Sequence, residues 1–146
     1  MNETAVYYQK LHADAQVPEY AHPTDAASDL RIIEDCTIEP MKRALVGTGL
    51  AMAIAPGLEG QIRPRSGNAW KKGLTVINSP GTIDSSYRGE IKIALINLGE
   101  ETIELKKGDR VAQMKIAPVI KANFVESSSL EETVRGSGGF GHTGIR

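Results

Sequence analysis

Short runs of alternating apolar and polar residues, separated by glycine and proline, constrain this chain more than any other sequence feature. The clearest runs have apolar residues at Ile91, Ile93 and Leu95, at Ile103 and Leu105, and at Ala112, Met114 and Ile116. Period two over such runs is typical of half-buried β-strands. The 15 glycines and seven prolines fall largely between the runs, where turns are expected. The pattern predicts an all-β fold, a jelly-roll-like barrel or sandwich.

One segment, residues 66–72, predicts a short helix within this β-fold. Ser66 suits its N-cap, and Lys71 and Lys72 would complement the negative end of the helix dipole. Gly73 suits a left-handed C-cap.

Charge and composition exclude several classes of function. The 146 residues include 17 basic and 18 acidic side chains, so no overall positive field would draw the protein to nucleic acid. Residues 1–12 have neither the basic start nor the apolar run of a signal peptide, and no segment approaches membrane-spanning length. The lone Cys36, read as a small buried apolar residue, fits a reducing compartment. We expect a cytoplasmic protein with neither nucleic-acid nor membrane partners.

The C-terminal segment 135–146 differs in composition from the rest of the chain. It contains a formal GxGxxG match from Gly136 to Gly141, but too few residues follow for the helix and acidic residue of a dinucleotide-binding fold. Its glycines instead suit close backbone approach to phosphate, with Arg135 as a cation and Phe140 as a ring for a base. The alternative is a mobile tail without function.

Two turn segments hold further candidates. Pro64-Arg65-Ser66-Gly67 offers a guanidinium, a hydroxyl and backbone N–H groups to an anion, or else is a surface arginine beside an ordinary helix cap. Residues 78–84 predict a turn or hairpin entering a strand. Asp84 there is either a turn former or, in the company of Asn78, Tyr87 and Arg88, a functional carboxylate.

Two more segments are ambiguous in isolation. Gln113 points away from the apolar face of its strand, and the neighbouring Asp109 and Arg110 suit a turn and a structural ion pair. Asp29 in Ala27-Ser28-Asp29-Leu30 has no obvious role alone. The histidines show no metal-ligand spacing with Cys36 or with each other, so no protein-built transition-metal site is expected.

Taken together, five segments resemble the five ordered motifs of the homotrimeric deoxyuridine triphosphatase (dUTPase) family. They are 27–30, 64–67, 81–89, 108–113 and 135–141, in the family's order and at its usual spacing. The chain departs from the commonest pattern at Ser28, where an aromatic residue is frequent, and at Asn68, where leucine is frequent. These departures bear on local packing rather than on the chemistry.

The resemblance implies a jelly-roll domain over residues 1–134 and an active-site lid over residues 135–146. It also implies a homotrimer with three shared sites. One subunit would supply the first, second and fourth motifs, a second the hairpin with Asp84, and a third the tail.

The implied reaction is hydrolysis of dUTP to dUMP and pyrophosphate by water attack at the α-phosphorus. Asp84 would be the general base, and Mg²⁺ would bridge the triphosphate, with Asp29 reaching it through water rather than directly. The hairpin backbone would read uracil, Tyr87 would exclude a 2′-hydroxyl and Phe140 would stack on the base. The expected substrate-binding residues are Arg65, Ser66, Gly67, Asn78, Gly81, Thr82, Ile83, Tyr87, Gln113, Arg135, Gly138, Phe140 and Gly141.

Two other functions fit the same fold. A dCTP deaminase would need a base and proton shuttle at C4 of the ring, and the complete tail and the Asp84–Tyr87 hairpin argue against it. A non-catalytic nucleotide sensor would need no general base, and the sequence lacks none of the expected catalytic residues.

Overall fold

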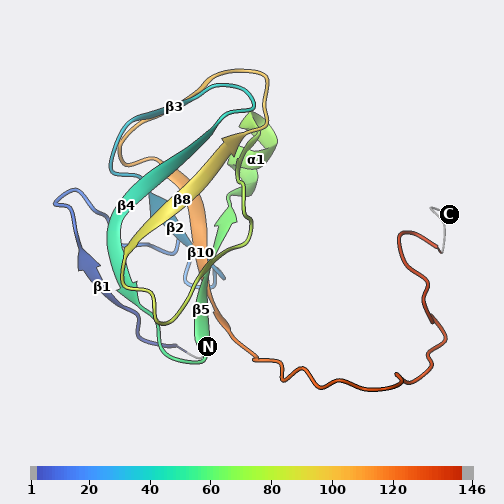
Figure 1. Ribbon diagram of the computed structural model, residues 1–146. Coiled ribbons are helices and arrows are strands. Elements are labelled where there is room, and N and C mark those ends of the chain that lie inside the picture. Colours follow the sequence, from blue (N-terminus) through green and yellow to red (C-terminus); the bar gives the residue numbers. More distant parts are fainter. Residues whose placement is uncertain (1–2, 143–146) are drawn as a thin grey trace.

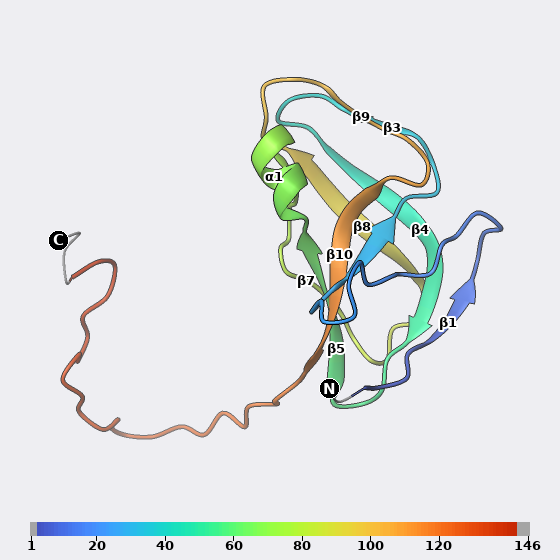
Figure 2. The same cartoon turned by 180° about the vertical axis from the view of Figure 1, so that it is seen from behind.

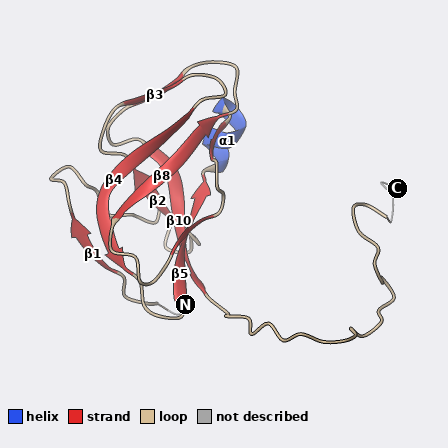
Figure 3. Cartoon of the chain, in the orientation of Figure 1, coloured by secondary structure: helices blue, strands red, loops and turns tan. Residues whose placement is uncertain are grey.

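The computed structural model describes residues 3–142 of the chain and builds them from short antiparallel strands and one helix (Figure 3). The elements, in chain order, are β1 (Tyr7–Lys10), β2 (Ser28–Arg31), β3 (Cys36–Ile38), β4 (Arg43–Ala53), β5 (Leu58–Pro64), α1 (Ser66–Lys72), β6 (Leu74–Val76), β7 (Gly81–Ile83), β8 (Glu90–Asn97), β9 (Ile103–Leu105) and β10 (Arg110–Pro118). The predicted all-β fold with one short helix is confirmed.

Two four-stranded sheets form the body of the molecule. Sheet A has the order β1-β4-β8-β6 and sheet B the order β2-β10-β5-β7, while β3 and β9 form a separate two-stranded ribbon. In Figure 1, β4 and β8 lie in front of β2 and β10, and Figure 2 shows the same layers from behind. A single apolar core joins residues of both sheets, such as Ile93 of β8 and Leu30 of β2.

The alternating runs identified in the sequence bury the expected residues. Ile91, Ile93 and Leu95 are at most 1% exposed, and Lys92 between them is exposed. Ile103 and Leu105 are also buried, on β9. Burial of large aliphatic side chains, each worth roughly 1.5–3 kcal/mol, is the main stabilisation of such a sandwich.

Strand β10 departs from strict alternation near its start. Its register with β2 shifts between Arg110 and Ala112, and both Val111 and Ala112 are buried. An extra residue in one strand is a β-bulge, which reverses the side-chain parity beyond it. Arg110 therefore lies on the outer face of sheet B, the face turned away from the core, instead of sharing the inner face with Met114.

The helix spans the predicted residues 66–72, but its N-cap residue differs from the prediction. Arg65, extended at φ −88° and ψ 126°, is the N-cap residue, and its side chain makes no capping hydrogen bond. The prediction that Ser66 is the N-cap is wrong, because Arg65, directly after β5, is still extended and Ser66 is already helical. The predicted C-terminus is confirmed: Lys71 and Lys72 occupy the last turn and Gly73 is left-handed at φ 69°.

Cys36 lies on β3, partly buried against the core as expected of a small apolar side chain. Burial raises the pKa of its thiol, so the side chain stays protonated and unreactive near neutral pH.

The described part of the chain after β10, residues 119–142, contains neither helix nor strand and extends away from the body (Figures 1 and 2). Its apolar side chains are exposed, including Phe124, Leu130 and Phe140. The last four residues of the predicted lid lie outside the described residues. Within residues 3–142, no helix combines the length and the apolar character needed to span a membrane.

The close packing of Gly73, at the end of α1, against the turn between β8 and β9 gives a stability prediction. A Cβ at Gly73 would meet the backbone of Leu98 and Gly99, and the position is also left-handed. Gly73→Ala should therefore lower the free energy of unfolding by about 3 kcal/mol, combining left-handed strain with overpacking. Urea denaturation at fixed protein concentration measures this.

Gly57→Ala is the matched control, because Gly57 is left-handed at φ 84° but has no neighbour within 4 Å of an added Cβ. It should cost only the backbone strain, about 1 kcal/mol. Equal losses in the two variants would contradict the packing explanation.

Candidate active site

Five of the predicted site residues line one hollow on the outer face of sheet B, at the start of α1. The hollow has a volume of about 460 Å³. The predicted residues on its wall are Asp29, Arg65, Ser66, Gly67 and Gln113, and the remaining lining residues are Ala21, Asp25, Ala26, Ala27, Arg63 and Lys115. Two larger hollows, of about 810 and 880 Å³, contain none of the predicted substrate-binding residues.

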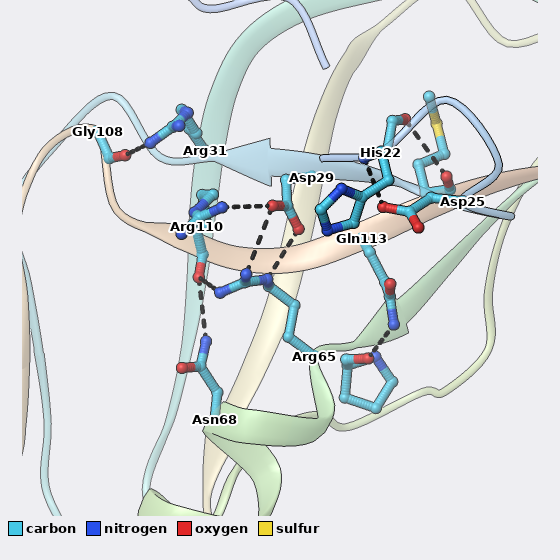
Figure 4. Close-up of polar contacts among 12 residues, drawn as sticks. His22, Asp25, Asp29, Arg31, Arg65, Asn68, Gly108, Arg110 and Gln113 are labelled. Carbon is cyan, nitrogen blue, oxygen red and sulfur yellow. Dashed lines mark hydrogen bonds and ion pairs between the residues drawn. The ribbon is translucent and has the colours of Figure 1, made fainter. Parts of the chain in front are cut away.

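Asp29 is the centre of the polar network beside this hollow (Figure 4). Arg65 donates from Nε to Oδ1 at 2.8 Å and from Nη2 to Oδ2 at 3.4 Å, and Arg110 donates from Nη1 to Oδ2 at 3.0 Å. The Asp29 side chain is 15% exposed, so these ion pairs are less screened than surface pairs. Two guanidinium groups thus fix the carboxylate, and the carboxylate in turn fixes Arg65.

Strand register brings Gln113 to the same wall. Gln113 on β10 lies opposite Asp29 on β2 and opposite Arg63 on β5. Directly paired residues of antiparallel strands share a face, so the three side chains form a row across sheet B. Gln113 donates from Nε2 to the carbonyl of Pro64 at 2.8 Å. This hydrogen bond holds the Gln113 carboxamide in one orientation, with its oxygen on the side away from Pro64.

The hairpin with Asp84 lies elsewhere in the same chain. Gly81–Ile83 form β7 at the opposite edge of sheet B from β2. Asp84 is exposed, and its carbonyl accepts a hydrogen bond from the Tyr87 N–H at 3.0 Å in a tight turn. The Tyr87 hydroxyl donates to the Glu90 carbonyl at 3.0 Å. Within the described residues, no member of the hairpin lines the Arg65–Gln113 hollow.

The tail residues are also remote from the hollow. Arg135, Gly138, Phe140 and Gly141 lie on the extended C-terminal segment, away from the body in both views (Figures 1 and 2). Arg135 donates from Nε to the Gly138 carbonyl at 2.8 Å, a local turn contact. The structure therefore brings together the first, second and fourth motifs and leaves the third and fifth apart.

The sequence did not predict the positions of several charged residues in and beside the network. Arg110 was predicted to pair with Asp109, but it pairs with Asp29, while Asp109 accepts a hydrogen bond from the Lys106 N–H at 2.8 Å. The β-bulge explains the error, because it turns Arg110 to the outer face. Arg63 lies two residues before Arg65, and Lys115 lies two residues after Gln113. Because alternate residues of a strand share a face, the sequence alone could have predicted both on this wall.

The two departures from the family pattern both make hydrogen bonds. Asn68 donates from Nδ2 to the Arg110 carbonyl at 3.0 Å, which ties α1 to β10 beside the network. Ser28 is buried, and its hydroxyl donates to the Met114 carbonyl at 3.4 Å. Polar side chains at these positions replace apolar packing with specific tethers.

No cluster of three or more metal-ligating side chains occurs among residues 3–142. Both oxygens of Asp29 already accept hydrogen bonds from guanidinium groups. A carboxylate so engaged fits hydrogen bonding to a hydrated cation better than direct ligation, because Mg²⁺ loses its waters reluctantly.

Comparison with known proteins decides the family. The dUTPase family profile matches residues 13–144, nearly the whole chain. The chain belongs to the dUTPase family. The deoxyuridine 5′-triphosphate nucleotidohydrolase of Nautilia profundicola is 54% identical over 136 residues, covering 93% of this chain and 96% of the relative. That of Clostridium tetani is 50% identical over 144 residues, covering 99% of both chains.

Solved structures of the same family share the fold. A variant of the Staphylococcus bacteriophage 80alpha dUTPase, with dUpNHpp, superposes with a TM-score of 0.90 at 26% identity, covering 98% of this chain and 100% of that one. A variant dUTPase from phage phi11 of S. aureus, described with a structural Mg(II) ion, gives a TM-score of 0.81 at 24% identity, over 88% of this chain and 100% of that one. The latter likeness concerns the fold alone.

The Asp29 network predicts a stability difference between two aspartates. Asp29→Asn keeps the shape but removes the charge that two guanidinium groups share, so the free energy of unfolding should fall by about 1.5–3 kcal/mol. Asp35→Asn weakens an ion pair with Lys106 whose side chains are 67% and 61% exposed, so its effect on the free energy of unfolding should be clearly smaller. Urea midpoints of both variants test this, and an equal effect would show that the Asp29 network is no more than a surface pair.

Proposed function

We propose that this chain hydrolyses dUTP to dUMP and pyrophosphate, with water attacking the α-phosphorus. This reaction would keep uracil out of DNA and supply dUMP for thymidylate synthesis. Membership of the dUTPase family supports the proposal, together with a hollow that offers a fixed guanidinium, a hydroxyl, a carboxamide and glycine N–H groups to phosphate oxygens.

The observation that carries the mechanism is the separation of Asp84 from Arg65 in one chain. Ile83 lies opposite Gly60, and Arg65 follows Gly60 by five residues along β5. At about 3.3 Å per residue, Ile83 lies roughly 16 Å from Arg65 along the strand direction, and Asp84, one residue further away, lies roughly 20 Å from it. A base and a phosphate ligand acting on one phosphorus must both lie within a few ångströms of it, as in-line attack requires. This separation supports a site that is assembled from different copies of the chain.

The assembly we propose is a homotrimer with three shared sites. One subunit contributes Asp29, Arg65 and Gln113, a second contributes the Asp84 hairpin and a third contributes residues 135–146 as a lid over a domain of residues 1–134. The exposed, extended C-terminal segment supports this role, since its apolar side chains have no partner surface in their own described body. A closed three-fold ring uses each contribution once per site.

Asp84 is the proposed general base. It follows the edge strand β7 directly and is exposed, so a neighbouring subunit can present a water to it. A carboxylate in its ionised form accepts the proton of that water as the oxygen attacks phosphorus, and pyrophosphate leaves. Arg65, Ser66, Gly67, Gln113 and Arg135 would hold the phosphate oxygens.

Recognition of uracil and deoxyribose falls to the same hairpin. Within the described residues β7 pairs only with β5, so the backbone of its other edge can donate to and accept from a pyrimidine edge. Asn78, Gly81, Thr82 and Ile83 form this edge and its approach. Tyr87 would pack against the sugar where a 2′-hydroxyl would project, and Phe140, with Gly138 and Gly141 beside it, would stack on the base.

Mg²⁺ bound to the triphosphate would neutralise its charge and prearrange it for attack. Asp29, and Asp25 on the same wall, would accept hydrogen bonds from the water shell of the ion. The guanidinium groups around Asp29 keep that carboxylate in one orientation.

We also predict a cytoplasmic location for the protein.

Substitution of the base tests the function. The intact protein should release pyrophosphate from dUTP and no ammonia from dCTP. Asp84→Asn should lower turnover roughly 10²–10⁴-fold while binding of a non-hydrolysable dUTP analogue survives. Asp35→Asn, an exposed carboxylate outside the site, should leave turnover unchanged.

Three results would contradict different parts of the proposal. Ammonia from dCTP would make the protein a deaminase. Nucleotide binding without any product would make it a sensor. Normal turnover in Asp84→Asn would mean that another residue activates the water.

A further inference from the structure

Two cations on the wall of the hollow have no part in the function proposed above. Arg63 precedes Arg65 by two residues, and Lys115 follows Gln113 by two residues. Gln113 lies opposite Arg63 and Lys115 lies opposite Gln61. Alternation along each strand and pairing between them therefore place both cations beside Gln113, on the outer face of sheet B.

Arg63 is held in position by its own strand. The Gln61 side-chain oxygen accepts hydrogen bonds from Nε of Arg63 at 3.1 Å and from Nη2, and Gln61 donates from Nε2 to Glu59 at 2.7 Å. A guanidinium has five N–H donors, so this clamp leaves three for another acceptor. The Arg63 guanidinium is therefore held in one orientation and still has N–H donors for an anion.

Neither Arg63 nor Lys115 has a carboxylate within ion-pair distance in the described part of the chain. Arg65 and Arg110, by contrast, both pair with Asp29. Arg63 and Lys115 are each half-buried, which strengthens their field in the hollow compared with fully exposed cations. A half-buried cation without a counter-charge is suited to bind an anion.

These two residues give the wall of the hollow its excess of positive charge. Its wall carries three cations, Arg63, Arg65 and Lys115, against the two carboxylates Asp25 and Asp29. Without Arg63 and Lys115 the wall would hold Arg65 against Asp25 and Asp29. Because Asp29 already pairs with Arg65 and with Arg110 beside the hollow, no cation without a counter-charge would then remain on the described wall. Arg63 and Lys115 therefore supply the positive charge on this wall that no carboxylate of the described residues neutralises.

We propose that Arg63 and Lys115 form a subsite for the pyrophosphate end of the substrate, its β- and γ-phosphates. These groups carry more negative charge than the α-phosphate, and they leave together as the product. The inference rests on the proposed hydrolysis of dUTP, and it adds two binding residues on β5 and β10 that act on the leaving half of the molecule.

Product inhibition tests the subsite. Arg63→Gln and Lys115→Gln should each raise the inhibition constant for inorganic pyrophosphate and the KM for dUTP about tenfold, as loss of a charged hydrogen bond at a part-exposed site does. The inhibition constant for dUMP should stay unchanged, and kcat should change less than about twofold, because uniform binding is lost rather than transition-state stabilisation. Lys115→Arg should restore both constants.

Lys10→Gln is the matched control, since it removes the same charge from β1, in sheet A. Unchanged pyrophosphate inhibition in both wall variants, no pyrophosphate inhibition of the unmodified protein, or equal weakening of dUMP and pyrophosphate would each overturn the subsite. If the unmodified protein does not hydrolyse dUTP, the proposed function fails by itself. Calorimetric binding of tripolyphosphate to the same variants then decides the subsite: weaker binding only in the wall variants supports it, and equal binding overturns it.

Discussion

The pairing of β10 with both β2 and β5 is the constraint on which the site depends. Its register sets Asp29, Gln113 and Arg63 in one row across sheet B, and the buried partners Ala112 and Met114 hold that register against slippage. The bulge at Val111 then turns Arg110 to the outer face, where it shares Asp29 with Arg65. A one-residue slip of β10 would bury Gln113 and Lys115 and expose core side chains, so the packing of the core also fixes where the proposed phosphate ligands lie.

The position of β7 is the feature that supports the proposed sharing of sites among copies of the chain. Strand β5 lies between β7 and β10, so the proposed base and the proposed phosphate ligands occupy separate places on one sheet. The C-terminal segment leaves the body after Pro118 and carries its ring at Phe140 into solvent. Each of these features would be a defect in a monomeric enzyme. In a ring of identical copies they are complementary, because each site then receives what its own chain holds at a distance.

The sequence predicts elements whose signal is local and misses those set by register. The strands around Ile93 and Met114, the helix 66–72 and the left-handed Gly73 follow from periodicity and capping chemistry. Strand β4 does not, because its residues 48–52 are all buried and show no alternation. Arg110 was assigned the wrong partner, since a bulge has no signature in residue type. The motif order indicated which residues form the site, but only strand order shows that Asp84 and Arg65 of one chain lie apart.

Reconstitution from two inactive proteins tests the shared site most directly. One protein carries Asp84→Asn with its tail intact, and the other lacks residues 135–146 but keeps Asp84. Unfolded together in equal amounts and refolded, they should form mixed trimers in which about a quarter of the sites join a working hairpin to a working tail, if the chains assort at random into closed rings. We predict pyrophosphate release from dUTP at about that fraction of the unmodified rate, well above the rate of either protein refolded alone. Activity that stays at the parental level, in samples whose mixed trimers are confirmed by mass, would show that hairpin and tail act within one subunit.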